Sequence, residues 1–288
     1  MTYPYILTFK STVSLVDDED DSGINLTTPT GKLKLNNISP GMREILKILL
    51  NIGDTEDGLC NVLEERDGRV NFAEFFYILN QFKECGLIQY NVNSVKGPLA
   101  TLESVTSQFK FIQKEISPDQ KLCLSRFTYC HRVGGRLVLE TPKGFARITL
   151  HNHISTAMLS LLSTPCTANS LCETIHEINM DETKAFLELL LNIDAAFEVV
   201  GKSVLSREED TALSYWEFHD LLFHARSRYG RNDSPSGGTY RFLNKTEPLP
   251  AVKPKMEGEI VALYKPDIEK LKKDDIPFTC VIEKRRSI

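Results

Sequence analysis

Histidine and cysteine are the side chains of this sequence most able to bind a transition metal, but their spacing does not indicate a metal site. His151 and His153 flank one residue at the start of an expected helix, and His219 and His224 lie five residues apart. Metal binding would need further ligands at characteristic spacings, and neither pair has them. Capping or packing is therefore the favoured role for these histidines.

The cysteines lead to the same conclusion. Their number is odd, they are spread along the chain, and no C-x-x-C pair occurs. This pattern indicates neither a zinc cluster nor a redox dithiol, and it favours small buried apolar residues. The seven are Cys60, Cys85, Cys123, Cys130, Cys166, Cys172 and Cys280.

Two further motifs are incomplete. Asp18, Asp20 and Gly23 fit early positions of an EF-hand calcium loop, but Pro29 stands where that loop needs a bidentate glutamate. The pair Gly237-Gly238 lies in an expected loop and not between a strand and a helix, and no G-x-S-x-G or Walker motif occurs. The sequence thus shows no self-contained catalytic site.

Composition narrows the classes of partner. The 288 residues are 41% hydrophobic and 25% charged, with a formal net charge of -5 and a pI near 5.8. An acidic chain is poorly suited to coating phosphate backbones, so we expect no nucleic-acid partner. No apolar run approaches the length of a membrane span and no secretory signal is visible, so we expect no membrane partner and a cytoplasmic location.

Hydrophobic periodicity in the first part of the chain predicts a strand, three short helices and a second strand. This order is typical of a winged helix-turn-helix module. Ser39-Pro40 is a helix-start signal, and Gly86 is expected to end the third helix. The predicted elements are a strand over 5–16, helices over 39–51, 55–65 and 72–84, and a strand over 87–92.

The same order occurs again about 105 residues later, which we interpret as a structural repeat. Between the two modules, residues 106–140 are predicted to be mostly β, with a hairpin turn at Gly134-Gly135. The elements predicted for the second module are a strand over 145–150 and helices over 152–163, 167–177 and 181–197.

The third helix of a winged helix-turn-helix module often faces DNA, and here its charge is unsuitable. Residues 72–84 carry Lys83 against Glu74 and Glu84. The third helix of the second module carries Lys184 against several acidic residues. Such faces would repel phosphate groups.

The most specific sequence segments lie in the second half of the chain. They are Leu124 to Phe127, Leu139 to Pro142, Arg147 to Leu150, Trp216 to Arg228, Gly237 to Phe242 and Pro248 to Pro254. These segments resemble the part that precedes the flavin domain in SagB/ThcOx-type dehydrogenases, and the resemblance covers most of residues 120–288. Residues 278–288 are similar to the first helix of that family's nitroreductase-like domain. There, Arg285, Arg286 and Ser287 match the start of the R-R-S-x-R motif that binds the phosphate of FMN.

The resemblance implies an FMN-dependent oxidation of peptides. Members of this family oxidise thiazoline and oxazoline rings in ribosomally made peptides to thiazoles and oxazoles, and pass a hydride to FMN and then to oxygen. Their N-terminal part is similar to modules that capture a leader peptide as an added strand beside the wing and the third helix. The peptide-binding residues expected here are Phe75, Leu79, Gln81, Gln89 and Tyr90, between the third helix and an edge strand.

The chain departs from the family pattern at its C-terminal end. Only part of the phosphate motif is present, so we expect that this chain alone does not hold FMN. It would be a fragment of a longer oxidase or work with a separate flavin subunit, and Arg285 and Arg286 could equally be cations at the end of an ordinary helix. Beside the precursor peptide, a homodimer or a flavin-domain partner is expected.

These observations predict an α+β chain with two tandem winged helix-turn-helix-like units, an extended arm and the start of a nitroreductase-like flavin domain. The predicted domains are residues 1–105, 106–205, 206–272 and 273–288. The predicted function is peptide recognition within an azoline dehydrogenase. The alternative left open is a stand-alone winged-helix adaptor or transcription-factor-like protein without catalysis.

Overall fold

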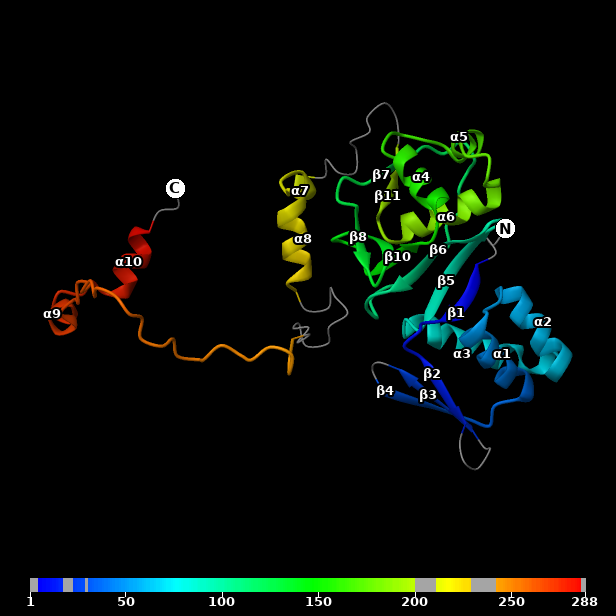
Figure 1. Ribbon diagram of the computed structural model, residues 1–288, viewed down its shortest axis with the longest axis horizontal. Helices are drawn as coiled ribbons and strands as arrows, with labels where there is room; N and C mark the ends of the chain where they lie inside the picture. The colour runs from blue at the N-terminus through cyan, green and yellow to red at the C-terminus, as the bar shows by residue number, and fades with distance from the viewer. Residues whose placement is uncertain (1–4, 18–22, 29–30, 200–210, 229–241, 286–288) are drawn as a thin grey trace. The chain divides into compact units, whose positions relative to one another are not determined.

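A six-stranded antiparallel sheet joins the two predicted modules (Figure 1). The computed structural model describes residues 5–17, 23–28, 31–199, 211–228 and 242–285. They divide into two units, residues 1–239 and 240–288, and the sheet belongs to the first. In spatial order its strands are β1 (Ile6–Phe9), β5 (Ile88–Ser94), β6 (Gly97–Ser104), β10 (Ala146–Leu150), β9 (Arg136–Glu140) and β8 (Tyr129–Val133).

Helices from both modules cover one face of this sheet, with α1 against β1 and α6 against β5 and β6. Local capping explains where they begin. The Ser39 hydroxyl accepts a hydrogen bond from the Met42 amide at 3.2 Å, and Asn179 and Glu182 form a reciprocal capping box. The helices are α1 (Pro40–Asn51), α2 (Glu56–Asp67), the 3-10 turn η1 (Arg69–Asn71), α3 (Phe72–Glu84), α4 (His153–Leu161), α5 (Ala168–Thr174) and α6 (Met180–Asn192).

The covered face is apolar across the sheet because side chains alternate along each strand. One row of paired residues runs Leu7, Tyr90, Leu102, Ile148 and Leu139 across five strands, and all five are buried. Phe82 of α3 packs edge-on against Phe9 of β1, with ring centroids 5.1 Å apart. The two modules therefore share one hydrophobic core.

Two turns depend on glycine, as the sequence predicted. Gly86 follows α3 with φ of 66°, and a Cβ there would lie 2.4 Å from the Ser104 hydroxyl oxygen. Gly134 and Gly135 join β8 to β9 with φ of 56° and 85°, which is the left-handed pair that a tight hairpin requires.

Two smaller sheets complete the first unit. The predicted strand over 5–16 is divided into β1 and β2 (Ser14–Asp17), and β2 begins a three-stranded sheet with β3 (Gly23–Thr28) and β4 (Gly31–Asn36). β3 and β4 were not predicted from the sequence, although Ile24 and Leu26 alternate with polar residues in the pattern of a half-buried strand. The other small sheet pairs β7 (Leu122–Leu124) with β11 (Ala196–Glu198).

Three further expectations need correction. Residues 106–121 contain no described strand, so the β content between the modules is confined to β7, β8 and β9. The strand predicted over 87–92 is β5, which pairs with β1 on one side and β6 on the other and so is not an edge strand. The domain boundary predicted after residue 105 lies inside the first unit, because β6 and β10 pair across it.

The second unit has little interior. Among its described residues 242–285, Cys280 is the one that is not exposed. It contains α9 (Ile268–Lys273) and α10 (Phe278–Lys284), and the predicted boundary at residue 273 lies at the end of α9.

Among the described residues of both units, no helix combines the length and the apolar character needed to cross a bilayer.

A buried carboxyl group lies where the two modules meet. Glu188 of α6 is fully buried and accepts hydrogen bonds from the Tyr5 hydroxyl, just before β1, and from the Lys114 amide between the modules. Burial raises the pKa of Glu188 above its ordinary 4.5, and the two hydrogen bonds only partly oppose this. The group therefore takes up protons more readily in the folded protein than in the unfolded chain.

This raised pKa predicts a specific pH dependence of stability. Above pH 4.5 and up to the raised pKa, the folded state binds more protons than the unfolded state, so the free energy of unfolding falls as the pH rises. Glu188→Gln should remove this slope from denaturant unfolding curves recorded at several pH values, at a hydrogen-bond cost of about 1–3 kcal/mol. The exposed Glu173→Gln should keep the slope, and a slope retained by Glu188→Gln would contradict the assignment.

Candidate functional site

The second face of the six-stranded sheet carries polar side chains and is not covered by α1–α6. We call it the polar face and define it by Thr8, Gln89, Asn91, Thr101, Glu103 and Arg147. Strand register brings these residues together from four strands, because Thr8 pairs with Gln89, Gln89 with Glu103, and Glu103 with Arg147. The same alternation that buries the apolar face therefore assembles this one.

A carboxylate lies at the centre of one row. Glu103 accepts a hydrogen bond from the Gln89 side-chain amide at 2.8 Å on one oxygen and an ion-paired hydrogen bond from Arg147 on the other. The Gln89 carbonyl in turn accepts from the Thr8 hydroxyl at 3.3 Å. Both side-chain oxygens of Glu103 are thus occupied by donors from neighbouring strands.

The next row continues the network. The Asn91 side-chain amide donates to the Ile6 carbonyl at 2.8 Å and to the Thr8 hydroxyl at 2.9 Å. The Thr101 hydroxyl donates to the Asn91 carbonyl oxygen at 2.7 Å and lies 2.8 Å from His151 Nε2. Since a hydroxyl has one proton to give, Thr101 must accept from His151, which assigns the histidine proton to Nε2.

These contacts form one continuous series of donors and acceptors, which we call the hydrogen-bond chain. It runs from His151 through Thr101, Asn91, Thr8 and Gln89 to Glu103, and each step points in the same direction. Burial lowers the pKa of His151, and the positive charge of Arg136 lowers it further, so the imidazole is neutral at pH 7. A series of hydrogen bonds of this kind fixes the participating side chains in place and polarises them all in the same direction.

A groove of about 1210 Å³ lies over the polar face. Besides the hydrogen-bond chain, it is lined by Lys10, Arg136, Val138 and the exposed Cys85. Among the described residues that line it, three are cationic (Lys10, Arg136 and Arg147) and one, Glu103, is anionic. Cations therefore outnumber anions among these described lining residues, although the whole chain is net negative.

The helix α8 (Phe218–Arg226) is anchored beside this groove, at β8 and β9. Arg226 forms an ion pair with the buried Glu140 at 2.6 Å and donates to the Tyr129 hydroxyl at 2.8 Å. Tyr129 and His131 both contact the other oxygen of Glu140, at 2.9 and 2.8 Å. Phe218 packs edge-on against Tyr129.

The charges of this anchor are strongly coupled. Burial would raise the pKa of Glu140, but the charge and hydrogen bond of Arg226, with hydrogen bonds from Tyr129 and His131, outweigh it and lower the pKa. Burial raises the pKa of Tyr129 to about 12. At neutral pH the anchor is therefore a carboxylate held by a guanidinium and a neutral phenol.

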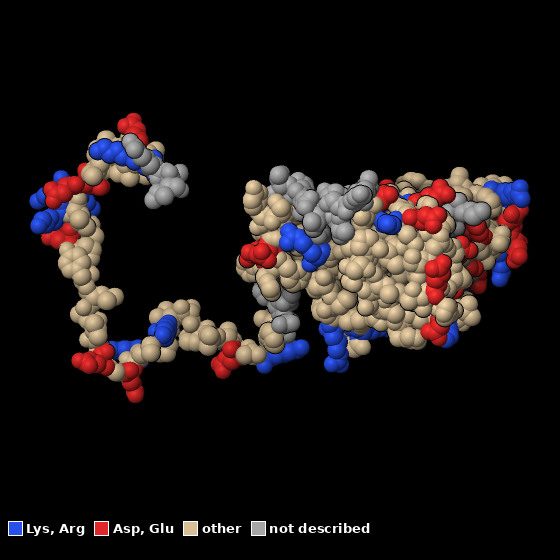
Figure 2. Space-filling view, turned by 90° about the horizontal axis from the view of Figure 1, so that it is seen from above, with Lys and Arg blue, Asp and Glu red and all other residues tan. Residues whose placement is uncertain are grey.

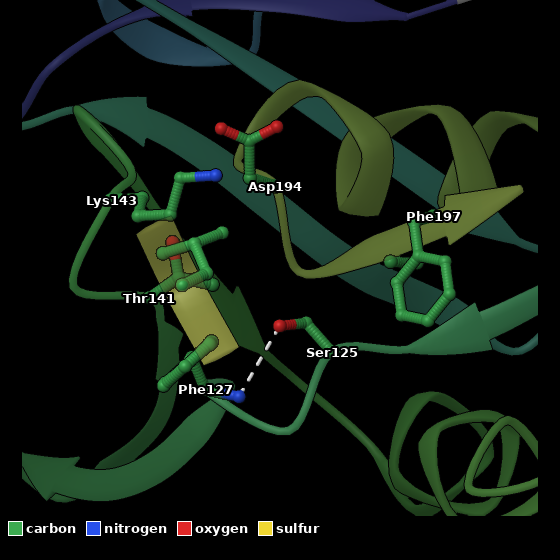
Figure 3. A pocket seen from close by; sticks show the side chains of 8 residues that line it. Ser125, Phe127, Thr141, Lys143, Asp194 and Phe197 are labelled. Carbon is green, nitrogen blue, oxygen red and sulfur yellow. Dashed lines mark hydrogen bonds between the residues drawn. The ribbon is translucent and has the colours of Figure 1, made fainter. Parts of the chain in front are cut away.

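A smaller pocket is lined by residues of the second module and by Leu213 of α7 (Thr211–Ser214), and Figure 3 shows it from close by. Lys143 and Asp194 lie on one side of it, while Ser125 accepts a hydrogen bond from the Phe127 amide at 3.2 Å on the other. Its volume of about 40 Å³ has room for a few water molecules and not for a peptide or a ring. We therefore do not regard it as a substrate site.

The predicted peptide-binding residues fall into two groups. Phe75, Leu79 and Tyr90 are buried in the core, so they present no surface to a peptide. Gln81 is half-buried on α3, and Gln89 lies in the groove as part of the hydrogen-bond chain. Phe75 and Leu79 of α3 were expected to line a groove together with Tyr90 of β5, but all three lie on the sides of these elements that pack into the core.

The residues predicted to bind FMN do not form a cradle within the described part of the chain. Arg285 follows α10 and is exposed, while Arg286 and Ser287 lie outside the described residues. No described residue in 242–285 is buried, so the described residues there provide no enclosed site for a flavin ring. The described residues of the second unit therefore do not form an FMN site on their own. They also contain no cluster of three or more His, Cys, Asp or Glu suited to a metal ion.

The described first unit is an α+β module in which helix-turn-helix units share one antiparallel sheet. Two family models match this chain: residues 122–233 match the cyanobactin oxidase ThcOx, and residues 1–113 match the ThcOx helix turn helix domain. The chain therefore belongs to the ThcOx/SagB-type azoline oxidases and corresponds to their N-terminal portion. The comparison with curated proteins found no match.

Sequence reasoning missed most of the polar face, although a local signal was present. Gln89, Asn91 and Asn93 alternate with buried Ile88, Tyr90 and Val92, which is the pattern of a strand with one polar side. The partners on β1, β6 and β10 are distant in sequence, and only the strand register brings them together.

The anchor of α8 can be tested by removing its cation. Arg226→Met leaves Glu140 buried without its counter-ion, a loss of about 3–5 kcal/mol for a buried pair, and should release α8 from the sheet. Hydrogen exchange followed by mass spectrometry should then show faster exchange in the segment 218–226. Asp220→Asn, which changes an exposed charge on the same helix, should leave exchange nearly unchanged. Equal exchange in Arg226→Met and wild type would show that the anchor does not hold the helix.

Proposed function

We propose that this chain recognises the peptide substrate of an FMN-dependent oxidase that converts thiazoline and oxazoline rings in ribosomally made peptides to thiazoles and oxazoles. The family supports a role in an oxidase of azoline-peptide biosynthesis. The observation that carries peptide recognition is the groove over the polar face. Its volume of about 1210 Å³ exceeds the ~300–1,000 Å³ of typical small-molecule sites, which favours an extended polymer as its ligand.

The exposed surface of the helices favours a peptide over a nucleic acid as the ligand. More than half of α6 is buried, including Phe186, Leu187 and Glu188, which leaves little of this helix to enter a DNA groove. The exposed part of α3 includes Glu74, Phe76 and Tyr77 and therefore offers little to a phosphate. In Figure 2 the visible face of the first unit is mainly uncharged, with Asp and Glu more prominent than Lys and Arg.

Exposed apolar side chains in the second unit favour a protein partner in addition to the peptide. Within the second unit, Leu249, Val261, Leu263 and Tyr264 are each at least 79% exposed. Apolar side chains on a segment without a core gain stability when another surface covers them. We propose that this segment packs on a flavin-bearing partner or a second copy of the chain, where FMN would be held by residues beyond those described.

Peptide recognition can be tested directly by fluorescence anisotropy. The purified chain would be titrated into a labelled precursor peptide, a scrambled peptide of the same composition, and a labelled DNA duplex. We expect saturable binding of the precursor peptide with a Kd of about micromolar order, and no saturation with the duplex. Equal responses to the precursor and scrambled peptides, or tight salt-sensitive binding of the duplex, would contradict the proposal.

A further inference from the structure

We propose that the polar face binds an acidic, extended peptide segment through side-chain contacts, with Arg136 as the anchor for a carboxylate. This inference rests on the proposed peptide recognition. It adds where the peptide binds, which kind of contacts hold it and what charge it carries. It differs from the expected strand addition at β5, which the structure excludes because both edges of β5 are already paired.

The charges around the groove favour an anionic ligand. Lys10, Arg136 and Arg147 face a single described carboxylate, Glu103, and that carboxylate already accepts from Gln89 and Arg147. Among the described lining residues, positive formal charges thus outnumber negative ones in a chain of net charge -5, and Arg136 is the cation for which no partner is described. A groove whose charges are mostly of one sign attracts and orients a ligand of opposite charge.

Arg136 is the residue best placed to act as the anchor. It is exposed at the start of β9, lines the groove, and has no hydrogen-bond or ion-pair partner among the described residues. Its guanidinium has five N–H donors in a planar arrangement that matches a carboxylate. Its charge already lowers the pKa of His151, which places it near that end of the hydrogen-bond chain.

The hydrogen-bond chain holds the side chains of the polar face in place before a ligand binds. Thr8, Gln89, Asn91 and Thr101 are held by one another, so little side-chain freedom is lost when a ligand binds. Amide and hydroxyl groups are also suited to the N–H and C=O groups of a peptide backbone. A backbone with carboxylates spaced along it therefore matches both the groups and the net charge of this groove.

The test uses two labelled synthetic peptides of equal length, one alternating Glu and Val and the other alternating Gln and Val. Anisotropy titrations of the full chain should show tighter binding of the acidic peptide and a loss of this preference at high salt. Arg136→Gln should weaken binding of the acidic peptide about fivefold, the scale expected for a solvent-accessible charge pair. Arg136→Lys should restore part of it.

Arg132→Gln is the matched control for charge. Arg132 is exposed on β8 in the same hairpin and pairs with Leu137, so it lies on the opposite side of the sheet from Arg136 and does not line the groove. The two variants lose the same charge and differ only in its position. Circular dichroism would establish that both are folded.

Cysteine alkylation gives a second measurement that does not depend on charge. Cys85 is exposed and lines the groove, whereas Cys130 is exposed on the other side of β8. The acidic peptide should slow alkylation of Cys85 and leave Cys130 unchanged, as followed by mass spectrometry. Each cysteine is compared with itself in the absence of peptide, because burial raises the pKa of the Cys130 thiol.

The outcomes separate this inference from the proposed function. If the precursor peptide binds but neither Arg136→Gln nor Cys85 protection has an effect, the polar face is not the site, although peptide recognition stands. Slower amide exchange over residues 32–36 instead would indicate strand addition at β4. A changed oligomeric state in Arg136→Gln would assign the face to a second copy of the chain. Failure of all precursor peptides to bind would overturn the proposed function itself.

Discussion

The pairing of β6 with β10 is the interaction on which the rest of the first unit depends. Five residue pairs, from Ala146 with Ser104 to Leu150 with Ala100, join strands that come from different modules. Because the register places Ile148 beside Leu102 and Arg147 beside Glu103, one pairing extends both the apolar and the polar face. A shift by one residue would exchange the two faces, so core packing fixes the register of the polar face as well.

The shared sheet buries much of α6, the third helix of the second module. In a free winged helix, the third helix presents its outer face to the solvent. Here α6 packs on β5 and β6, and its Glu188 is buried beside Tyr5 and the chain between the modules. In the second module the helix-turn-helix pattern therefore contributes mainly to the core, and the polar side of the sheet is the face that α1–α6 leave uncovered.

The elements that could be predicted from the sequence are those set by local signals. The bounds of α1, α2 and α3 follow from capping at Ser39 and Thr55, from helical spacing of apolar residues and from Gly86. The strand partners could not be predicted, because pairing depends on residues far apart in the chain. For that reason β5 was wrongly expected at an edge, whereas the direction of Gln89, away from the core, follows from its alternation with buried Ile88 and Tyr90.

Under the proposed function, the two units would meet their ligands in physically different ways. On the polar face, the hydrogen-bond chain ending at Glu103 fixes the side chains before any ligand arrives, and α8 is tied beside it through Arg226 and Glu140. In residues 242–285, exposed apolar side chains have no core of their own, so their order must come with the surface that covers them. The proposed peptide-binding surface of the first unit would thus be formed before the peptide arrives. Assembly of the second unit with a flavin-bearing partner would be coupled to ordering of that unit.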